Sequence, residues 1–478
     1  MVRQKVLLRD LPPCESSNAP GQRTANARRS RGSTEPSAPG RGVRRSARPE
    51  DSMRRPIPTT VVLAVAFLVA SAARAAELRS GPLQGHTTDR SARVWVQGTG
   101  PGEVRLRLRS GDGTTRTVGP VAFDPERAFI AVLTVDGLQP NGRWRYDLLV
   151  GEEVVEGGPW TLRTLPSPGS GAVRIAFGSC LKPSVSPEQP VFEAIVAAKP
   201  DAFLWLGDNL YFSNRDLREA KGLWKRYRKV RALPSLRALF AGCANLAQWD
   251  DHDYGPNNSD RTFPLRRVSR EAFVAYWPNP SAGEDGEGIY TRAVLGPVEV
   301  FLLDDRWFRD PNRKPDGPEK VILGERQLRW LLEGLRESVA PIKVVATASQ
   351  FLARYHRFES FAMASHERER LVAGLTEAGV RGVLFVSGDR HLAEVIRWPA
   401  RPGGQPLWEI TSSPLANRSW PDGERVPNPD RVFIYGRGPN FGWIEADAAS
   451  KSLLVELRDA RGKTLWSRDL SELWPGDR

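Results

Sequence analysis

Beyond residue 172, the chain contains six apolar runs that each end in a short polar stretch, with helical patterns such as 325–337 and 367–378 between them. The runs are 173–177, 202–206, 245–249, 298–303, 344–348 and 383–386. Alternation of buried strands with helices is typical of an α/β domain. Because α/β sheets build their sites at the C-terminal ends of their strands, we expect the six polar stretches to converge on one cleft.

The polar stretches are rich in metal-binding side chains: Cys180, Asp208, Tyr211, the cluster Asp250, Asp251, His252 and Asp253, then Asn257, Asp389 and His391. So many carboxylates in one cleft would repel one another and take up protons unless a cation neutralised them. Thiolate, phenolate, carboxylate and imidazole donors suit ferric iron. Oxygen donors from Asn257 and Asp389, with Asp208 shared, suit Ca²⁺, Mg²⁺ or Mn²⁺. A carboxylate that bridges two ions is typical of two-metal phosphoester hydrolysis.

Five ordered motifs resemble those of the PhoD-like alkaline phosphatases, which belong to the metallophosphatase, or calcineurin-like phosphoesterase, superfamily. They are Gly-Ser-Cys at 178–180, Gly-Asp-Asn-Leu-Tyr at 207–211, Trp-Asp-Asp-His-Asp-Tyr-Gly-Pro-Asn at 249–257, Leu-Asp-Asp-Arg at 303–306 and Ser-Gly-Asp-Arg-His at 387–391. The resemblance implies a catalytic domain over 172–478, built as a sandwich of mixed β-sheets flanked by helices. It also implies an N-terminal β-sandwich and export from the cell.

The resemblance also implies roles for individual residues. Cys180, Asp208, Tyr211 and His391 would hold Fe³⁺. Asp208 would bridge to a divalent ion completed by Asn257 and Asp389. Asp250, Asp251 and Gln350 remain open as further metal or substrate contacts. The common metallophosphatase pattern, Asp-x-His and Gly-His-x-His, reads Gly-Ser-Cys and Gly-Asp-Arg-His here, and the chain has only five His. The His-rich version of the site is therefore excluded.

Three of these residues also have a structural interpretation. Cys180 would pair with Cys243, because exported thiols tend to oxidise unless a metal holds them. Tyr211 would be a packed aromatic side chain. His252 would be a satisfied core histidine, whereas in the catalytic interpretation it donates a proton to the leaving oxygen or orients the phosphate.

The two arginines in the motifs differ in what we expect of them. Arg306 would pair with Asp304 or Asp305, but a bidentate guanidinium fits phosphate oxygens well, so we favour substrate contact. Arg390 is expected to be a surface group or a neighbour of the ligands rather than a ligand itself.

Residues 76–165 alternate apolar and polar side chains between turns rich in Gly, Pro and Asp, which predicts an all-β module. The sequence Gly137–Pro140 followed by Trp144–Tyr146 looks like the turn and aromatic corner of an immunoglobulin or fibronectin type III sandwich, where an aromatic hydroxyl ties the turn down. Residues 166–171 form the expected linker to the catalytic domain.

The N-terminal residues have the composition of a leader. Residues 1–52 are too polar to fold, and we interpret them as disordered or as an upstream mis-start. Residues 53–75 join a basic start, an apolar run at 61–70 and small residues at Ala73 and Ala75, which predicts a signal peptide cleaved before Ala76. A membrane anchor is the alternative, and the Sec and Tat routes both remain open.

The charge is concentrated in that leader. The whole chain carries +13, but residues 1–75 account for +9 of it, so the rest carries only +4. Specific nucleic-acid binding by the folded part is therefore not expected. With 40% hydrophobic residues, global disorder is excluded.

Together these observations predict a periplasmic or secreted alkaline phosphatase in which a metal-bound hydroxide attacks phosphate monoesters, and diesters as a further possibility. Its substrate would be a small-molecule or polymer phosphoester, without a permanent membrane anchor. One alternative is a phosphodiesterase that acts on wall polymer, phospholipid or nucleic acid. Another is a non-catalytic, metal-stabilised surface-binding protein.

Overall fold

The computed structural model describes residues 76–355 and 358–475, which all fall within one unit of the chain, Ala72–Arg478. The predicted mis-start at 1–52 and the predicted signal peptide at 53–75 lie outside the described residues, so neither prediction is tested. Among the described residues, no helix is long and apolar enough to cross a membrane.

The N-terminal residues form two antiparallel sheets around a common core. The first contains β1 (Leu78–Thr87), β2 (Ala92–Gly98) and β5 (Ile130–Val135) in that order; the second has the order β4 (Thr115–Ala122), β3 (Glu103–Arg109), β6 (Arg143–Val150), β7 (Glu153–Val154), with β8 (Trp160–Arg163) also on β6. Val94 and Leu133 from the first sheet and Leu106 and Leu148 from the second belong to one buried cluster. The all-β prediction is confirmed, while the immunoglobulin-like assignment stays a prediction.

The prediction that an aromatic hydroxyl holds the turn at 137–140 by a hydrogen bond is wrong. Tyr146 is buried in the core, and its hydroxyl has no hydrogen-bond partner among the described residues. Thr164 holds the turn instead, because its hydroxyl donates to the carbonyl of Gln139 (2.5 Å) and accepts from the N–H of Gly142 (2.9 Å). A threonine after β8 thus does what the sequence assigned to the tyrosine.

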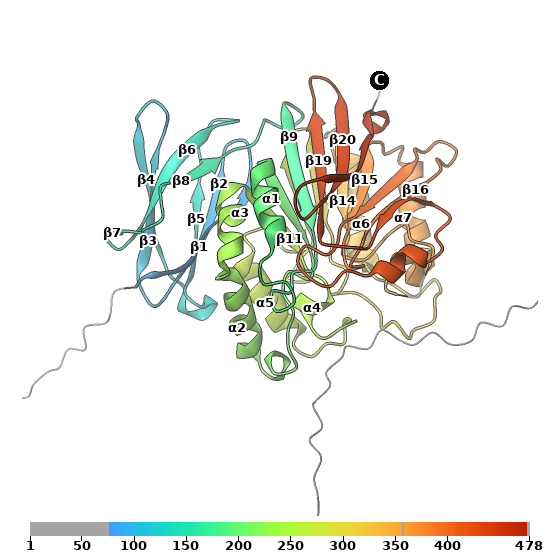
Figure 1. Ribbon diagram of the computed structural model, residues 1–478, viewed down its shortest axis with the longest axis horizontal. Helices are drawn as coiled ribbons and strands as arrows, with labels where there is room; N and C mark the ends of the chain where they lie inside the picture. Colours follow the sequence, from blue (N-terminus) through green and yellow to red (C-terminus); the bar gives the residue numbers. More distant parts are fainter. Residues whose placement is uncertain (1–75, 356–357, 476–478) are drawn as a thin grey trace, which may run out of the picture. The chain divides into compact units, whose positions relative to one another are not determined.

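Two mixed sheets follow in the region where the sequence predicts the catalytic domain (Figure 1). The first has the order β11 (Ala244–Gln248), β10 (Ala202–Leu206), β9 (Ala172–Gly178), β19 (Asn440–Asp447), β20 (Ser452–Asp459), β21 (Thr464–Asp469). The second has the order β12 (Thr291–Leu295), β13 (Val298–Leu302), β14 (Ile342–Ala346), β15 (Val383–Ser387), β17 (Leu407–Thr411), β16 (Ala393–Trp398), β18 (Arg431–Tyr435). Strands β9, β10 and β11 run parallel, as do β13, β14, β15 and β17.

Helices cover the outer faces of the two sheets, which explains why the strands are apolar on both sides. The α-helices are α1 (Pro190–Ala198), α2 (Ala220–Arg231), α3 (Arg237–Gly242), α4 (Asp251–Tyr254), α5 (Arg266–Tyr276), α6 (Gly324–Glu337) and α7 (Ser365–Glu377), and the short 3-10 helices are η1 (Pro125–Arg127), η2 (Asp216–Arg218), η3 (Pro234–Leu236), η4 (Phe361–Ala364), η5 (Pro421–Arg425) and η6 (Ser471–Leu473). On β10, Phe203 and Trp205 pack toward the helices, whereas Leu204 and Leu206 pack toward the second sheet. The α/β prediction, including α6 and α7, is confirmed.

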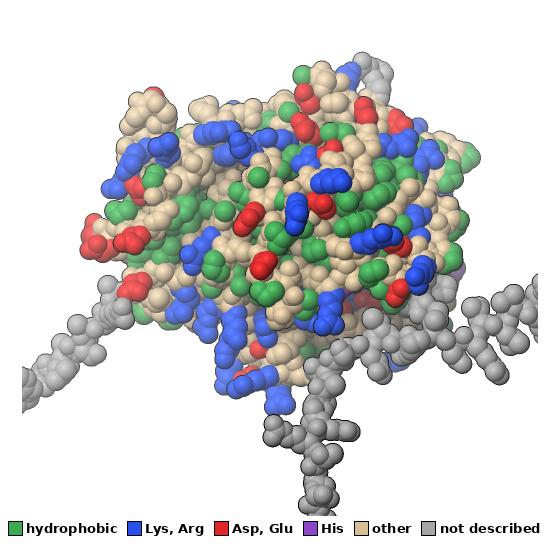
Figure 2. All heavy atoms as spheres, viewed as in Figure 1, with side chains coloured by type: hydrophobic (Ala, Val, Ile, Leu, Met, Phe, Trp, Pro, Cys, Tyr) green, Lys and Arg blue, Asp and Glu red, His purple; other side chains and the backbone are tan. Residues whose placement is uncertain are grey.

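Basic side chains gather on one part of the surface. Figure 2 shows Lys and Arg crowded over α2, whereas elsewhere on this face they mix with Asp and Glu. The exposed basic residues of this helix are Lys221, Lys225, Arg228 and Lys229. The small net charge of the folded part therefore hides a local basic surface.

Candidate metal centre

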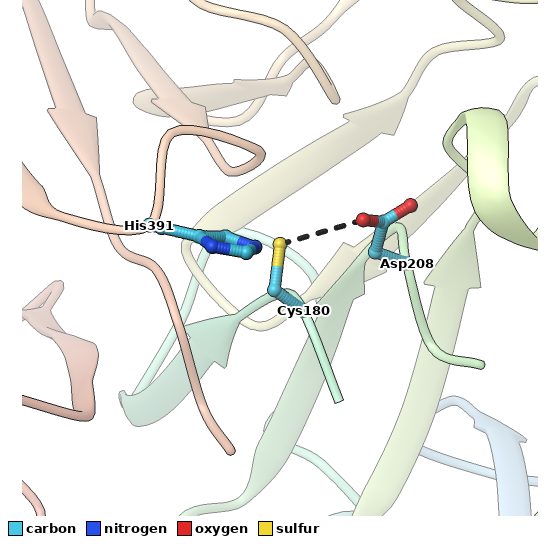
Figure 3. A group of neighbouring side chains, drawn as sticks. All are labelled: Cys180, Asp208 and His391. Atoms are coloured by element: carbon cyan, nitrogen blue, oxygen red, sulfur yellow. Dashed lines mark hydrogen bonds between the residues drawn. The ribbon is translucent and has the colours of Figure 1, made fainter. Parts of the chain in front are cut away.

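Three side chains from three strand ends face one another at the centre of the site (Figure 3). Cys180 follows β9, Asp208 follows β10, and His391 follows β15. Their ligand atoms all lie within 4.8 Å of one another, and Cys180 Sγ lies 3.6 Å from Asp208 Oδ2. Because β9 and β10 are adjacent parallel strands, their carboxyl ends meet at one edge, and β15 adds a residue from the second sheet.

The backbone at these positions has an unusual conformation. Cys180, Asp208, Asp389 and His391 have φ angles of 63°, 52°, 63° and 55°, in the left-handed region that few non-glycine residues adopt. Hydrogen bonds to serine side chains stabilise this strained backbone conformation at Asp389 and His391. The N–H of Asp389 donates to Ser179 Oγ (3.2 Å) and that of His391 donates to Ser413 Oγ (3.1 Å). Such strain concentrates at functional sites, because the conformation aims the side chains inward.

A second ligand group shares Asp208 with the first. Asp208, Asp251 and His252 also have ligand atoms within 4.8 Å of one another. The N–H of His252 donates to Asp208 Oδ1 (3.2 Å), so Oδ1 faces the second group while Oδ2 faces Cys180. A carboxylate with one oxygen toward each group is what a bridge between two cations requires.

Tyr211 lies between the two groups. Its hydroxyl is 3.4 Å from His391 Nε2, and its ring lies 4.3 Å from the ring of His252, centroid to centroid. Burial and the neighbouring Asp208 and Cys180 raise the pKa of Tyr211. Without a cation the phenol therefore stays protonated, whereas a bound cation would favour the phenolate.

The electrostatics of the protein alone favour a cation. Burial raises the pKa of Asp208, and the charges of Asp251 and Asp250 raise it further. Burial also raises the pKa of Cys180, with help from Asp208 and Asp389. Burial lowers the pKa of His391 to about 4, so its imidazole is neutral and able to bind a metal.

The pKa values of two further acids of the site, Asp389 and Asp251, are shifted in opposite directions. Burial raises the pKa of Asp389 to about 6, although the guanidinium of Arg390 opposes the rise. For Asp251, burial acts in the same direction, but His252, Arg306 and the N–H of Asn258 overcome it and hold the pKa at about 2. Asp251 is therefore the acid of the cluster best prepared to bind a hard cation.

Arg306 lies in the interior of the protein and is paired with acids there. Its side chain is fully buried; Nε donates to Asp250 Oδ1 (2.6 Å) and Nη2 to Glu359 Oε2 (2.7 Å). The structural alternative named Asp304 and Asp305 as partners, yet the partners are Asp250 and Glu359. The guanidinium of Arg306 therefore positions Asp250 and Glu359, and its predicted contact with phosphate stays a prediction.

The other predicted residues lie in different surroundings. Asn257 is exposed, beside Asn258. Gln350 is buried and hydrogen-bonded to Glu394 (2.8 Å) and Thr411 (2.9 Å), so its amide is occupied in another network. Cys180 and Cys243 are both free and buried, so the disulfide alternative is wrong.

Two residues without a predicted role as ligands also shape the site. Asp253 accepts hydrogen bonds from the N–H groups of Asp208 (3.3 Å), Asn209 (3.1 Å) and Asp250 (2.6 Å). It therefore holds together the segments that follow β10 and β11. Asn417 Nδ2 lies 3.3 Å from His391 Nε2. The motif at 249–257 signalled Asp253, but no local pattern marks Asn417, which reaches the site from a distant loop.

A family model described as PhoD-like phosphatase matches residues 175–457, more than half of the chain. The chain belongs to the PhoD-like phosphatase family. The five motifs that suggested this family all lie within the matched residues. A second family model, for a domain of unknown function, matches residues 75–163, close to the predicted N-terminal module.

Individual relatives agree with this assignment. Alkaline phosphatase D of Bacillus subtilis (strain 168) is 25% identical over 323 residues, which cover 56% of this chain. The chain spans about half the length of this curated relative (54%). The solved structure of PhoD matches with a TM-score of 0.66 over 81% of this chain and 91% of that chain, at 19% identity, and supports the shared fold.

Proposed function

We propose that this PhoD-like protein is an exported, metal-dependent phosphoesterase that hydrolyses phosphate monoesters. The observation that carries the proposal is the pair of ligand groups that share Asp208, with the soft donor Cys180 on one side and the hard donor Asp251 on the other. Family membership supports phosphoester chemistry, and the predicted leader at 53–75 supports export.

The donor sets fit two different ions. Cys180, Asp208, Tyr211 and His391 would hold Fe³⁺, because two anionic and polarisable donors favour a highly charged metal. Asp208 and Asp389 would hold Ca²⁺ or another divalent ion, with Asn257 as a predicted ligand and Asp251 favoured by its low pKa. When bound, such ions supply positive charge to the phosphate and lower the pKa of water.

The protein's own residues would then control protons and orientation. His252 belongs to the group of Asp208 and Asp251 but not to the group of Cys180 and His391. Its imidazole lies 4.0 Å from Asp251 and stacks near Tyr211, which fixes the ring. We assign His252 to proton donation toward the leaving oxygen, the role predicted from the motif.

Replacing His252 by Gln should lower kcat by about 10²-fold, within the range for loss of a general acid. The loss should be larger for alkyl phosphates than for 4-nitrophenyl phosphate, because a good leaving group needs no proton. Steady-state kinetics on both esters measure the difference. An equal loss on both esters would contradict the proton-donor role.

Replacing Cys180 by Ser should remove most of the iron while leaving the divalent ion bound. The thiolate is the softest donor of the first group and has no part in the second. Elemental analysis of protein purified without added metals tests this, with Cys243→Ser as the matched control because Cys243 is buried away from both groups. Equal iron in the Cys180→Ser variant and the wild type would contradict the assignment.

One assay distinguishes the predicted alternatives. We expect wild-type protein to hydrolyse 4-nitrophenyl phosphate faster than bis-4-nitrophenyl phosphate, as kcat/KM. A reversed preference would favour the phosphodiesterase. Protein that carries metal but hydrolyses neither ester would favour the non-catalytic binding protein.

A further inference from the structure

Arg390 lies between two predicted ligands, Asp389 and His391, and the structure places it neither at the surface nor in an ion pair. Its side chain is only 5% exposed. Three aromatic rings surround its guanidinium: the Cζ atom lies 4.2 Å from the centroid of Phe358, 4.9 Å from that of Trp420 and 5.3 Å from that of Tyr355. These rings define the aromatic cage of Arg390.

The hydrogen-bonding edge of this guanidinium is unused. Nε and Nη2 are both buried, and neither has a hydrogen-bond partner among the residues that the structure describes. These two nitrogens lie on the same edge of the guanidinium, the edge that donates two parallel hydrogen bonds to an oxyanion. A buried donor without a partner is costly, and cation–π contacts with the rings engage only the faces of the group. Because none of the described residues supplies an acceptor, the edge is prepared to bind one from a ligand.

The cage adjoins the candidate metal centre without being part of it. The N–H of Trp420 donates to the carbonyl of His391 (2.8 Å), which holds one wall of the cage against the site. The rings of Tyr355, Phe358 and Trp420 are each half-buried, so the cage reaches the protein surface. Within the described residues, no hydrogen bond or ion pair joins Arg390 to Asp208 or Asp251. An anion on the Arg390 edge is thus distinct from a phosphate held at the two ligand groups.

Other cations lie near His391. Lys182 Nζ lies 5.0 Å from the centroid of the Tyr211 ring, and Arg418, which is exposed, follows Asn417, the residue that contacts His391. Positive charge at the rim of an acidic site suits a substrate with more than one anionic group.

We propose that Arg390 and its aromatic cage form a subsite for a second phosphoryl group of the substrate, beside the phosphate that reacts. The inference rests on the proposed function and adds a preference for substrates whose leaving group is itself phosphorylated. The planar guanidinium, held by the rings, would donate Nε–H and Nη2–H to two oxygens of that group. Because both nitrogens are shielded from solvent here, one of the half-buried rings must shift when the group binds.

Two matched substrates test the subsite: hydroquinone monophosphate and hydroquinone bisphosphate. Both esters release a hydroquinone oxygen, and their leaving groups differ only in the second phosphoryl group. We expect the wild-type enzyme to have a lower KM for the bisphosphate, after correction for its two equivalent esters. The Arg390→Gln variant should raise that KM by about tenfold to hundredfold, the range for a lost charged hydrogen bond, with kcat little changed. The KM for the monophosphate should change less than threefold.

Two further variants make the result specific. Arg390→Lys keeps the charge but loses the paired donors, so we expect it to retain less than half of the selectivity. Arg397→Gln is the matched control, since Arg397 also lies over a tryptophan ring (Trp408, 5.5 Å) but is exposed on β16. It should behave as the wild type does.

The outcomes separate this inference from the proposed function. If the wild type hydrolyses the monophosphate but Arg390→Gln keeps the wild-type KM ratio, the subsite is refuted and the proposed function stands. If Arg390→Gln lowers kcat equally on both substrates, Arg390 only supports its neighbours Asp389 and His391, and the subsite is refuted as well. If the wild type hydrolyses neither substrate, both proposals fall.

Discussion

Replacing Asp208 by Asn is expected to reduce kcat/KM on phosphate monoesters by at least ~100-fold, because outer-shell partners alone cost about 10–100-fold and a bridging ligand should exceed them. The variant removes the negative charge that both ligand groups share. The fold should survive, since Asn adopts the left-handed conformation of this position as readily as Asp. The amide oxygen also keeps an acceptor for the N–H of His252.

The Asp208→Asn variant is compared with a control variant, and its metal content is measured as well as its activity. Asp285→Asn removes an exposed carboxylate from a loop outside the site and should leave activity unchanged. Elemental analysis of the Asp208→Asn variant should show loss of at least one metal per chain. Turnover within tenfold of the wild type, with both metals retained, would refute the bridging role.

Replacing Arg306 by Met should lower the free energy of unfolding by about 3–5 kcal/mol, the cost of breaking a buried charge pair. The methionine fills part of the volume but leaves Asp250 buried without its cation, whereas Glu359 keeps only its pair with Arg309. Urea unfolding followed by tryptophan fluorescence measures the change. The matched control is Arg437→Met, which breaks an exposed pair with Glu424 and should have little effect.

A second variant tests the electrostatic explanation of that loss. Adding Asp250→Asn to Arg306→Met removes the uncompensated carboxylate charge, so the double variant should recover part of the stability. A double variant less stable than Arg306→Met would show that packing, rather than charge, explains the loss. Unchanged stability in Arg306→Met itself would contradict the buried pair.

Much of the fold could be predicted from the sequence because its signals are local. Continuous apolar runs predicted the strands β9, β10, β11, β13, β14 and β15, and period-3.6 patterns predicted the helices α6 and α7. The polar residues after each strand predicted where a site would form. Cys180, Asp208 and His391 were found this way. Each follows an apolar run directly, and the carboxyl ends of parallel strands meet for reasons that do not depend on side-chain detail.

What remained undetermined was the partner of each polar side chain. Thr164 rather than the hydroxyl of Tyr146 holds the N-terminal turn, and Gln350 bonds to Glu394 in a separate network. These pairings join residues tens of positions apart and depend on distances of a few tenths of an ångström. No spacing rule in the sequence encodes them.

The two motif arginines show this division most clearly. By itself the sequence determined the α/β sheets, the strand ends that carry the ligand residues and the family motifs, because these follow from periodicity and residue type. Only the tertiary structure decided that Arg306 is committed to two buried acids, whereas Arg390 lies in an aromatic cage where no described residue accepts from its Nε and Nη2. The physical reason is that a guanidinium binds whichever acceptors folding brings to its edge, and those acceptors come from segments far away along the chain.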